Sequence, residues 1–367
     1  MKIGLNSCTC IVLFCLFFPA SIFGQTAAGN NTATNSTAIK GLFESDKVLE
    51  LTLSGNTADL VNDRNDNPAY HPMLLQYQDE TGNGISLRIE MKTRGHFRKL
   101  KENCFYPPLQ IHFFKSDTLA ASVFSEQDKL KLVMPCKEDQ YVIREWLVYK
   151  IYNLVTSKSF RARLVQVKLY DLKKRKTTAP FYGILLESEK QMAKRNNAIA
   201  ITRKLIPEQM EPNAFLKMAA FEYLIGNTDW GIQYLQNIKL VAKDSNAMPT
   251  AVPYDFDHAG LVDAPYAMPA EELMMNSVRE RRYRGFCLKE MKYFEPAITF
   301  YNGLKKNIYD LYTNCVLLDA KYIKATLNYF DEFYKTINDP KKLQKEFSYP
   351  CDKNGTGNVV IKGLKQD

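Results

Sequence analysis

Two acidic segments in the second half of the chain carry the residue types that phosphoryl transfer needs. In the segment GNTDW, Asp229 follows an apolar stretch, and Asn237 stands just before the next predicted strand. In the segment PYDFDHAG, Asp255 and Asp257 follow a further apolar strand. Phosphoryl transfer needs one carboxylate to orient the acceptor hydroxyl, and an Asn and an Asp to hold Mg²⁺ against the phosphates. The ligand types therefore occur in the required chain order, and oxygen ligands suit Mg²⁺ or Mn²⁺ rather than zinc.

A lysine and a glutamate earlier in the chain could complete such a site. Alternation in the predicted strand Leu130–Val133 and its flank puts Lys129 and Lys131 on one face, so either lysine could point at a nucleotide. The predicted helix Tyr141–Leu154 then offers Glu145. In kinase-like enzymes a strand lysine holds the phosphates and a helix glutamate positions it. Taken alone, Lys131 is more typical of a solvated strand lysine, and Glu145 is more typical of an exposed helix acid.

Other interpretations of these segments remain open. Asn-Thr-Asp after a helix is also a good C-cap and turn. Asp-Phe-Asp could form a calcium loop in an exported protein. Further along, four arginines could grip an acidic substrate or a phosphate, or form a solvated charge run: Arg279, Arg281, Arg282 and Arg284.

The order of periodic segments predicts the fold class and the elements that position these residues. Alternation at period two predicts strands, and apolar spacing near 3.6 predicts helices. The predicted strands are Leu49–Leu53, Ile85–Met91, Leu109–Phe113, Leu130–Val133, Val165–Leu172, Phe181–Leu186, Ile238–Val241 and Val252–Asp255. The predicted helices are Tyr141–Leu154, Pro212–Ile225 and several between Glu290 and Phe347. This order predicts an α+β protein with a two-lobed protein-kinase-like fold, a strand-rich amino lobe and a mostly helical carboxy lobe.

The N-terminus has the pattern of an export signal. A lysine, a short apolar run and small residues near Gly24 form a secretory signal peptide over residues 1–24. The run is too short to span a bilayer, which takes about 20 residues, although an uncleaved anchor is the alternative. Residues 25–40 predict a flexible leader, 41–190 the amino lobe, 191–347 the carboxy lobe and 348–367 a loose tail. We therefore expect an exported, periplasmic or extracellular product with no transmembrane span after signal removal.

Composition excludes several classes of protein. With 46% hydrophobic residues the chain is not disordered, and its net charge of +9 over 367 residues gives no case for a nucleic-acid binder. Four histidines without an HExxH motif make a zinc site improbable. Removing residues 1–24 leaves five of the eight cysteines, so at least one thiol stays unpaired unless chains cross-link.

Four segments together resemble the atypical kinase-like proteins of the spore coat protein H type, within a group of exported bacterial proteins of unassigned role. The resemblance runs from about Glu90 to Phe286 and is distantly shared with secretory-pathway kinases. The segments that carry it are Thr93-Arg94-Gly95, Arg144–Asn153, Gly226–Trp230 and Pro253–Gly260.

The resemblance implies a role for each matching residue. Asp229 would orient the acceptor as the base, and Asp255 would bind the metal, with Asp257 as the alternative. Asn237 would be the second metal ligand, although Gln233 stands nearer to Asp229.

The nucleotide contacts follow from the same resemblance. Lys131, paired with Glu145, would contact the nucleotide phosphates. No GxGxxG loop is present, so Arg94 could contact the nucleotide by charge instead, or belong to a basic surface cluster.

The function expected from these residues is an exported, metal-dependent phosphotransferase. It would use Mg²⁺ or Mn²⁺ and take ATP as co-substrate, acting on a hydroxyl of an unknown protein or glycan acceptor. Because ATP is scarce outside the cytoplasm, nucleotidylyl transfer at the same site is a related option. The alternatives are a catalytically silent kinase-like binding module of the cell envelope and a calcium-stabilised surface protein.

Overall fold

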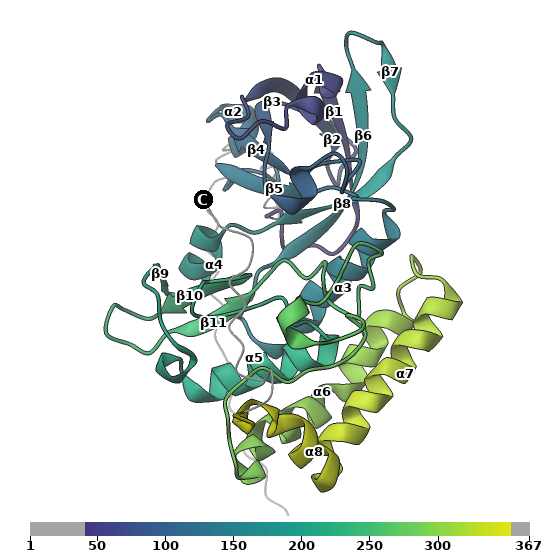
Figure 1. The fold of residues 1–367 in the computed structure, drawn as a ribbon. Coiled ribbons are helices and arrows are strands. Elements are labelled where there is room, and N and C mark those ends of the chain that lie inside the picture. Colours follow the sequence, from purple (N-terminus) through teal and green to yellow (C-terminus); the bar gives the residue numbers. More distant parts are fainter. Residues whose placement is uncertain (1–40, 354–367) are drawn as a thin grey trace, which may run out of the picture. The chain divides into compact units, whose positions relative to one another are not determined.

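Seven strands from the first half of the chain close into a barrel, drawn at the top of Figure 1. The computed structural model describes residues 41–353. The strands follow the order β1-β2-β3-β4-β5-β8-β6, and β6 returns to pair with β1. Their bounds are β1 Leu49–Gly55, β2 His71–Gln78, β3 Gly84–Thr93, β4 Leu109–Phe113, β5 Lys129–Val133, β6 Ala162–Asp171 and β8 Phe181–Leu186, with a two-residue strand β7, Lys176–Thr177, extending β6.

One parallel pairing closes the barrel. All neighbouring strands run antiparallel except β1 and β6, which pair in parallel with Leu49 opposite Val165. Alternation along each strand sends one set of side chains inward, as Leu51 and Leu53 show on β1, and these form an apolar core inside the barrel.

The expected two-lobed protein-kinase-like fold is wrong. The structure has a closed mixed barrel and a helical C-terminal region in place of a kinase-like amino lobe. Two features escaped the sequence interpretation. The strand β2, with Met73, Leu75 and Tyr77 buried at period two, was not predicted. The parallel β1–β6 pairing joins segments distant in sequence, and local periodicity carries no information about such partners.

The second half of the chain combines helices with a small sheet of order β11-β10-β9. The sheet consists of β9 Ile199–Ile201, β10 Ile238–Ala242 and β11 Thr250–Pro253. The helices within residues 41–353 are α1 Thr57–Asn62, α2 Asp117–Ala120, α3 Gln140–Val155, α4 Glu189–Arg195, α5 Pro212–Ile225, α6 Glu295–Thr313, α7 Ala320–Ile337 and α8 Pro340–Phe347. Short 3₁₀ turns include η1 Phe97–Lys99 and η5 Tyr349–Cys351.

Several predicted elements are confirmed to the residue. The strands β4 and β8 and the helix α5 have the predicted bounds, and α3 differs by one residue at each end. These segments are apolar or alternating runs without internal Gly or Pro breaks, apart from Gly183 in β8 and Pro212 at the start of α5. The missed elements β9, α1, α2 and α4 are all seven residues long or shorter, so they offer too few positions for a period to show.

The helix α3 joins the barrel to the helical region. It packs against β6 and β8 on one side and against α5 and α6 on the other. Ten of its sixteen residues are buried, which explains why its sequence is apolar all round rather than on one stripe. Figure 1 shows α3 between the barrel and the helices α5 to α7.

The helix α5 is capped at both ends, and its C-terminus leads into one of the acidic segments. Glu211 accepts hydrogen bonds from the amides of Asn213 and Ala214, and Pro212 takes the first helical position. The helix ends at Gly226, which has the left-handed conformation with φ +68°. The chain thereby turns directly into Asn227 and the loop of Asp229.

Two disulfides lie in the described part of the chain. Cys104 pairs with Cys136 and Cys287 with Cys351, which leaves Cys315 as a free thiol. Cys351 thus ties down the start of the segment expected to be a loose tail. The predicted signal peptide, the leader and residues 354–367 lie outside the described residues. Within residues 41–353, none of the helices has both the length and the apolar character that crossing a membrane requires.

Replacing Gly226 by alanine should destabilise the fold. A left-handed conformation costs an L-residue about 1–2 kcal/mol, and the added Cβ would stand 2.1 Å from the Tyr329 hydroxyl. We expect Gly226→Ala to lower the free energy of unfolding in urea by at least this amount. Gly303→Ala is the matched control, because Gly303 lies inside α6 with no atom within 4 Å of its Cβ position. It should stabilise by about 0.5–1 kcal/mol; equal effects would contradict the explanation.

Candidate functional site

The structure brings six of the predicted site residues to one cavity of about 510 Å³. Barrel elements supply Arg94, from the loop after β3, and Lys131, from β5. The second half of the chain supplies the other four: Asp229, Asn237, Asp255 and Asp257. The seventh predicted residue, Glu145 on α3, is buried and is not among the described residues that line the cavity. The cavity therefore lies where the barrel meets the loops around β10 and β11.

The central contact of the cavity joins Lys131 to Asp255. The Nζ of Lys131 donates a hydrogen bond to Oδ1 of Asp255 over 3.1 Å. Alternation on β5 buries Leu130 and Leu132 in the barrel and turns Lys131 outward to the cavity. Lys129 is exposed and is not among the described residues that line the cavity, so the open choice between the two lysines falls on Lys131.

The surrounding charges keep Asp255 ionised. Burial alone would raise the pKa of Asp255, but Lys131 and Arg98 outweigh it and hold that pKa below the ordinary value of 3.8. Its side chain is 32% exposed, so the carboxylate remains accessible from the cavity. Among the described residues, Oδ2 of Asp255 has no hydrogen-bond partner. One carboxylate oxygen is therefore available to a ligand.

Glu145 pairs with Arg98 rather than with Lys131. The expected Lys131–Glu145 pair is absent from the described residues. The Nη1 of Arg98, on η1, lies 3.8 Å from Oε2 of Glu145 and 3.5 Å from Oδ2 of Asp257. Burial would lower the pKa of Arg98, but Tyr266, Asp257 and Glu145 raise it above its usual range. Arg98 is thus the buried counter-ion of Asp257 and also lies beside the carboxyl group of Glu145.

Asp229 is held by two neighbouring amides. Gln236 donates to its Oδ1 over 2.9 Å, and Asn237 donates to its Oδ2 and to its backbone carbonyl, each over 2.9 Å. Burial raises the pKa of Asp229, while His258 and the Gln236 hydrogen bond oppose this. A carboxylate with a raised pKa accepts a proton more readily, as a general base requires.

The backbone at the two candidate metal ligands is left-handed. Asn237 has φ +48° and Asp255 has φ +64°. Such conformations are costly for non-glycine residues and persist only where the surroundings impose them. Here the carbonyl of Asn237 accepts from the amide of Tyr254, and the amide of Asp255 donates to the Tyr149 hydroxyl. The fold therefore holds both side chains in defined positions.

The residues fit a weakly protein-ligated divalent cation. The described residues contain no cluster of three or more His, Cys, Asp or Glu side chains that could hold a metal. Mg²⁺, however, is usually held by one or two carboxylates together with substrate phosphates and waters. Oδ2 of Asp255 and Oδ1 of Asn237 have no hydrogen-bond partner among the described residues. These two oxygens match that requirement, whereas Gln233 is not among the described residues that line the cavity.

The predicted arginine run binds backbone carbonyls outside the cavity lining. The four arginines are half-buried and are not among the described residues lining the cavity. Each donates to a backbone carbonyl: Arg279 to Gly260, Arg281 to Leu224 and Tyr329, Arg282 to Leu273, and Arg284 to Thr228 and Trp230. They are thus neither a solvated charge run nor a grip on a substrate in the cavity.

Arg284 is the member of this run that bears most directly on Asp229. It holds the carbonyls of Thr228 and Trp230, the two residues that flank Asp229. Burial lowers the pKa of Arg284 to about 10, and the charges of Asp229 and Glu222 oppose the decrease. The side chain that fixes the Asp229 loop therefore comes from a segment more than fifty residues away.

Sequence reasoning missed further residues of the cavity. Gln236 and His258 line it, and His258 makes edge contacts with Phe97 and Tyr266. Both missed residues adjoin residues that were predicted, Asn237 and Asp257, so position beside a predicted ligand was the available signal. The partnership of Arg98 with Glu145 had no such signal, because it depends on how η1 packs against α3.

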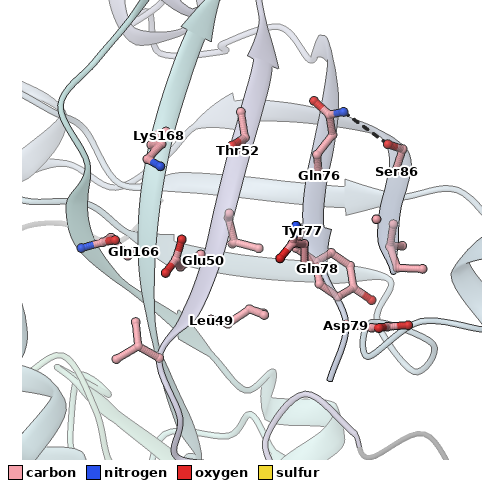
Figure 2. A pocket seen from close by; sticks show the side chains of 14 residues that line it. Leu49, Glu50, Thr52, Gln76, Tyr77, Gln78, Asp79, Ser86, Gln166 and Lys168 are labelled. Atoms are coloured by element: carbon pink, nitrogen blue, oxygen red, sulfur yellow. Dashed lines mark hydrogen bonds between the residues drawn. The ribbon is translucent and has the colours of Figure 1, made fainter. Parts of the chain in front are cut away.

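A second hollow, of about 610 Å³, lies on the outer face of the barrel over β6, β1, β2 and β3. Figure 2 shows amide, hydroxyl, apolar and charged side chains there, with Gln76 donating to Ser86 over 3.4 Å. The charged residues of its lining are Glu50, Asp79 and Lys168. Asp79 is bound within its own turn by Thr81 and Asn83. This hollow therefore offers less for acid–base or metal chemistry than the first cavity.

Glu145 should make stability fall as pH rises. Burial, followed by Asp257, raises its pKa from 4.5 to about 8, while Arg98 opposes the increase. Below pH 4.5 both the folded and unfolded chains carry this proton. Between pH 4.5 and 8 the unfolded chain loses it while the folded chain keeps it, so folding loses stability. Over this range the free energy of unfolding of the wild type should fall relative to that of Glu145→Gln in urea titrations. Glu50→Gln, on the exposed face of β1, is the control; parallel curves for wild type and Glu145→Gln would contradict the assignment.

Comparison with known proteins leaves the site to be judged on its own geometry. No protein-family model matches the chain, and none of the curated proteins matches it. The resemblance to the spore coat protein H type therefore stays a prediction from four short segments. Three of these segments, those of Arg94, Asp229 and Asp255, do line one cavity.

Proposed function

We propose that the chain is an exported, metal-dependent phosphotransferase that transfers the γ-phosphoryl group of ATP to a hydroxyl of a protein or glycan. The observation that carries this proposal is the Lys131–Asp255 contact of 3.1 Å in a cavity that Asp229 and Asn237 also line. A phosphate-binding cation, candidate metal ligands and a candidate base thus meet in one place. The barrel fold is not part of the support, because function depends on the site.

Lys131 and Asp255 would bind the nucleotide together. Asp255 and Asn237 would hold Mg²⁺ or Mn²⁺, which when bound neutralises charge on the phosphate oxygens. Lys131 would be shared between Asp255, which it contacts over 3.1 Å, and the phosphates of a bound nucleotide. Arg94 and Lys239 line the same cavity and add positive charge that favours a polyphosphate.

Asp229 would orient and deprotonate the acceptor. Its carboxylate is positioned by Gln236 and Asn237, and its pKa is raised by burial. In the transfer, the acceptor oxygen forms a bond to the γ-phosphorus while the bond from that phosphorus to the ADP oxygen breaks. The acceptor proton passes to Asp229. Positioning and charge account for most of the catalysis in this class of reaction.

Two disulfides support the export part of the proposal. Disulfides such as Cys104–Cys136 form and persist in oxidising compartments and are rare in the cytosol. An exported transferase needs a local nucleotide supply, which keeps nucleotidylyl transfer at the same site as an alternative outcome. A silent binding module of the cell envelope and a calcium-stabilised surface protein are the other outcomes that the experiments below separate.

Metal and ATP together should stabilise the wild-type protein against heat. A ligand present at 100 times its dissociation constant stabilises by about 2.7 kcal/mol. We expect a higher midpoint of thermal unfolding with Mg²⁺ or Mn²⁺ plus ATP, and no increase in Asp255→Asn. Asp128→Asn is the control, because Asp128 is 82% exposed and lies outside the cavity lining. No shift at millimolar ATP would contradict the proposal. A shift with Ca²⁺ alone would favour the calcium-stabilised protein.

Removing the base should abolish transfer while leaving nucleotide binding intact. General-base catalysis contributes about 10²–10⁴-fold to a rate. Asp229→Asn should therefore lower the release of labelled phosphate from [γ-³²P]ATP, with water as acceptor, by roughly 10²-fold or more. Its thermal shift with metal and ATP should persist. Equal release by wild type and variant would contradict the role of Asp229. A wild type that binds ATP and releases neither phosphate nor pyrophosphate would be a silent module.

A further inference from the structure

Arg98 is a buried cation placed among the carboxylates of the candidate site. Its side chain is 9% exposed, and one of its terminal nitrogens donates to the carbonyl of Met134. The other, Nη1, lies 3.5 Å from Asp257 and 3.8 Å from Glu145 and makes no directional hydrogen bond with a described residue. Arg98 therefore holds its position through charge and packing, directly beside one of the two aspartates of the DFD segment.

The two aspartates of that segment have different surroundings. The side chain of Asp257 is 9% exposed, and its Oδ2 faces both Arg98 and the Tyr266 hydroxyl, which donates over 3.1 Å. The side chain of Asp255 is 32% exposed and contacts the mobile end of a lysine. A lysine side chain can rotate away from its partner when a ligand arrives. Arg98 cannot do so easily, because it is buried and bound to the Met134 carbonyl.

A second divalent cation at Asp257 would meet strong repulsion. It would have to share the carboxylate with a guanidinium that is buried and bound to the Met134 carbonyl. Low local dielectric makes repulsion between like charges large. The same guanidinium already compensates the carboxylate of Asp257, which is the electrostatic task that a second metal would perform.

We propose that Arg98 is the permanent second cation of this site, so that the cavity binds a single divalent ion, at Asp255. This inference rests on the proposed function, since it specifies how many ions the proposed nucleotide site takes. It assigns Asp257 the task of holding Arg98, and it leaves Glu145 paired with Arg98 instead of with the phosphate lysine. Arg98 is a positioning residue in this scheme.

Equilibrium dialysis can count the bound ions. The full chain is dialysed against Mn²⁺ and adenylyl imidodiphosphate, an ATP analogue that resists hydrolysis at the terminal phosphate, and metal and nucleotide bound per chain are measured. We expect one Mn²⁺ per bound nucleotide in the wild type and in Asp257→Asn. Asp255→Asn should bind no Mn²⁺ with the analogue. Two ions per nucleotide in the wild type, with the second lost in Asp257→Asn, would overturn the inference and leave the proposed function standing.

Variants of Arg98 test why only one ion binds. Removal of the guanidinium in Arg98→Met should admit a second Mn²⁺, whereas Arg98→Lys, which keeps the charge, should bind one. Lys101→Met is the matched control, because it removes one charge from an exposed position in the same loop and should also bind one. A single ion in folded Arg98→Met would overturn the role of Arg98. If Arg98→Met does not fold, the counts for wild type, Asp257→Asn and Arg98→Lys still decide. No Mn²⁺ with the analogue in the wild type would instead overturn the proposed function.

Discussion

The ion pair between Lys131 and Asp255 is the contact on which the candidate site depends. Lys131 belongs to the barrel and Asp255 to the loop after β11, so one contact of 3.1 Å fixes two separate parts of the fold against each other. It also sets the charge state, because it keeps Asp255 ionised despite burial. Asp255 holds its left-handed backbone through the Tyr149 hydroxyl of α3. The barrel, the helix α3 and the loop after β11 therefore all help to position Asp255.

The grouping of the candidate residues was more predictable from sequence than the fold that carries them. Short motifs such as GNTDW and DFDHAG place ligand-type side chains just after regular elements. The helix before the first was predicted with the correct bounds, and the strand before the second two residues too far along the chain. Barrel closure was not predictable, because it depends on β6 finding β1 as a parallel neighbour and on the overlooked strand β2. A correct set of local elements thus led to a wrong global fold.

Local sequence patterns also could not predict which charged residues form ion pairs with each other. Glu145 and Lys131 were predicted as a pair from chain order. In the structure Glu145 lies beside Arg98, and Lys131 contacts Asp255. The arginines from Arg279 to Arg284 show the same limit, because a charged run in the sequence became a set of donors to distant carbonyls. Tertiary packing decides which charged side chains pair with each other. The pairing matters because a buried charge without a partner costs several kcal/mol of stability.

The Cys104–Cys136 disulfide makes the geometry of the site depend on the redox conditions in which the chain folds. Cys104 follows the turn η1 that carries Arg98, and Cys136 follows the strand β5 that carries Lys131. A covalent bond therefore limits how far apart Arg98 and Lys131 can move. Such a bond forms only where thiols are oxidised. A chain held in a reducing compartment would contain every residue of the site but would lack this restraint on the spacing of Arg98 and Lys131. Transfer to an oxidising compartment would therefore complete the geometry of the site.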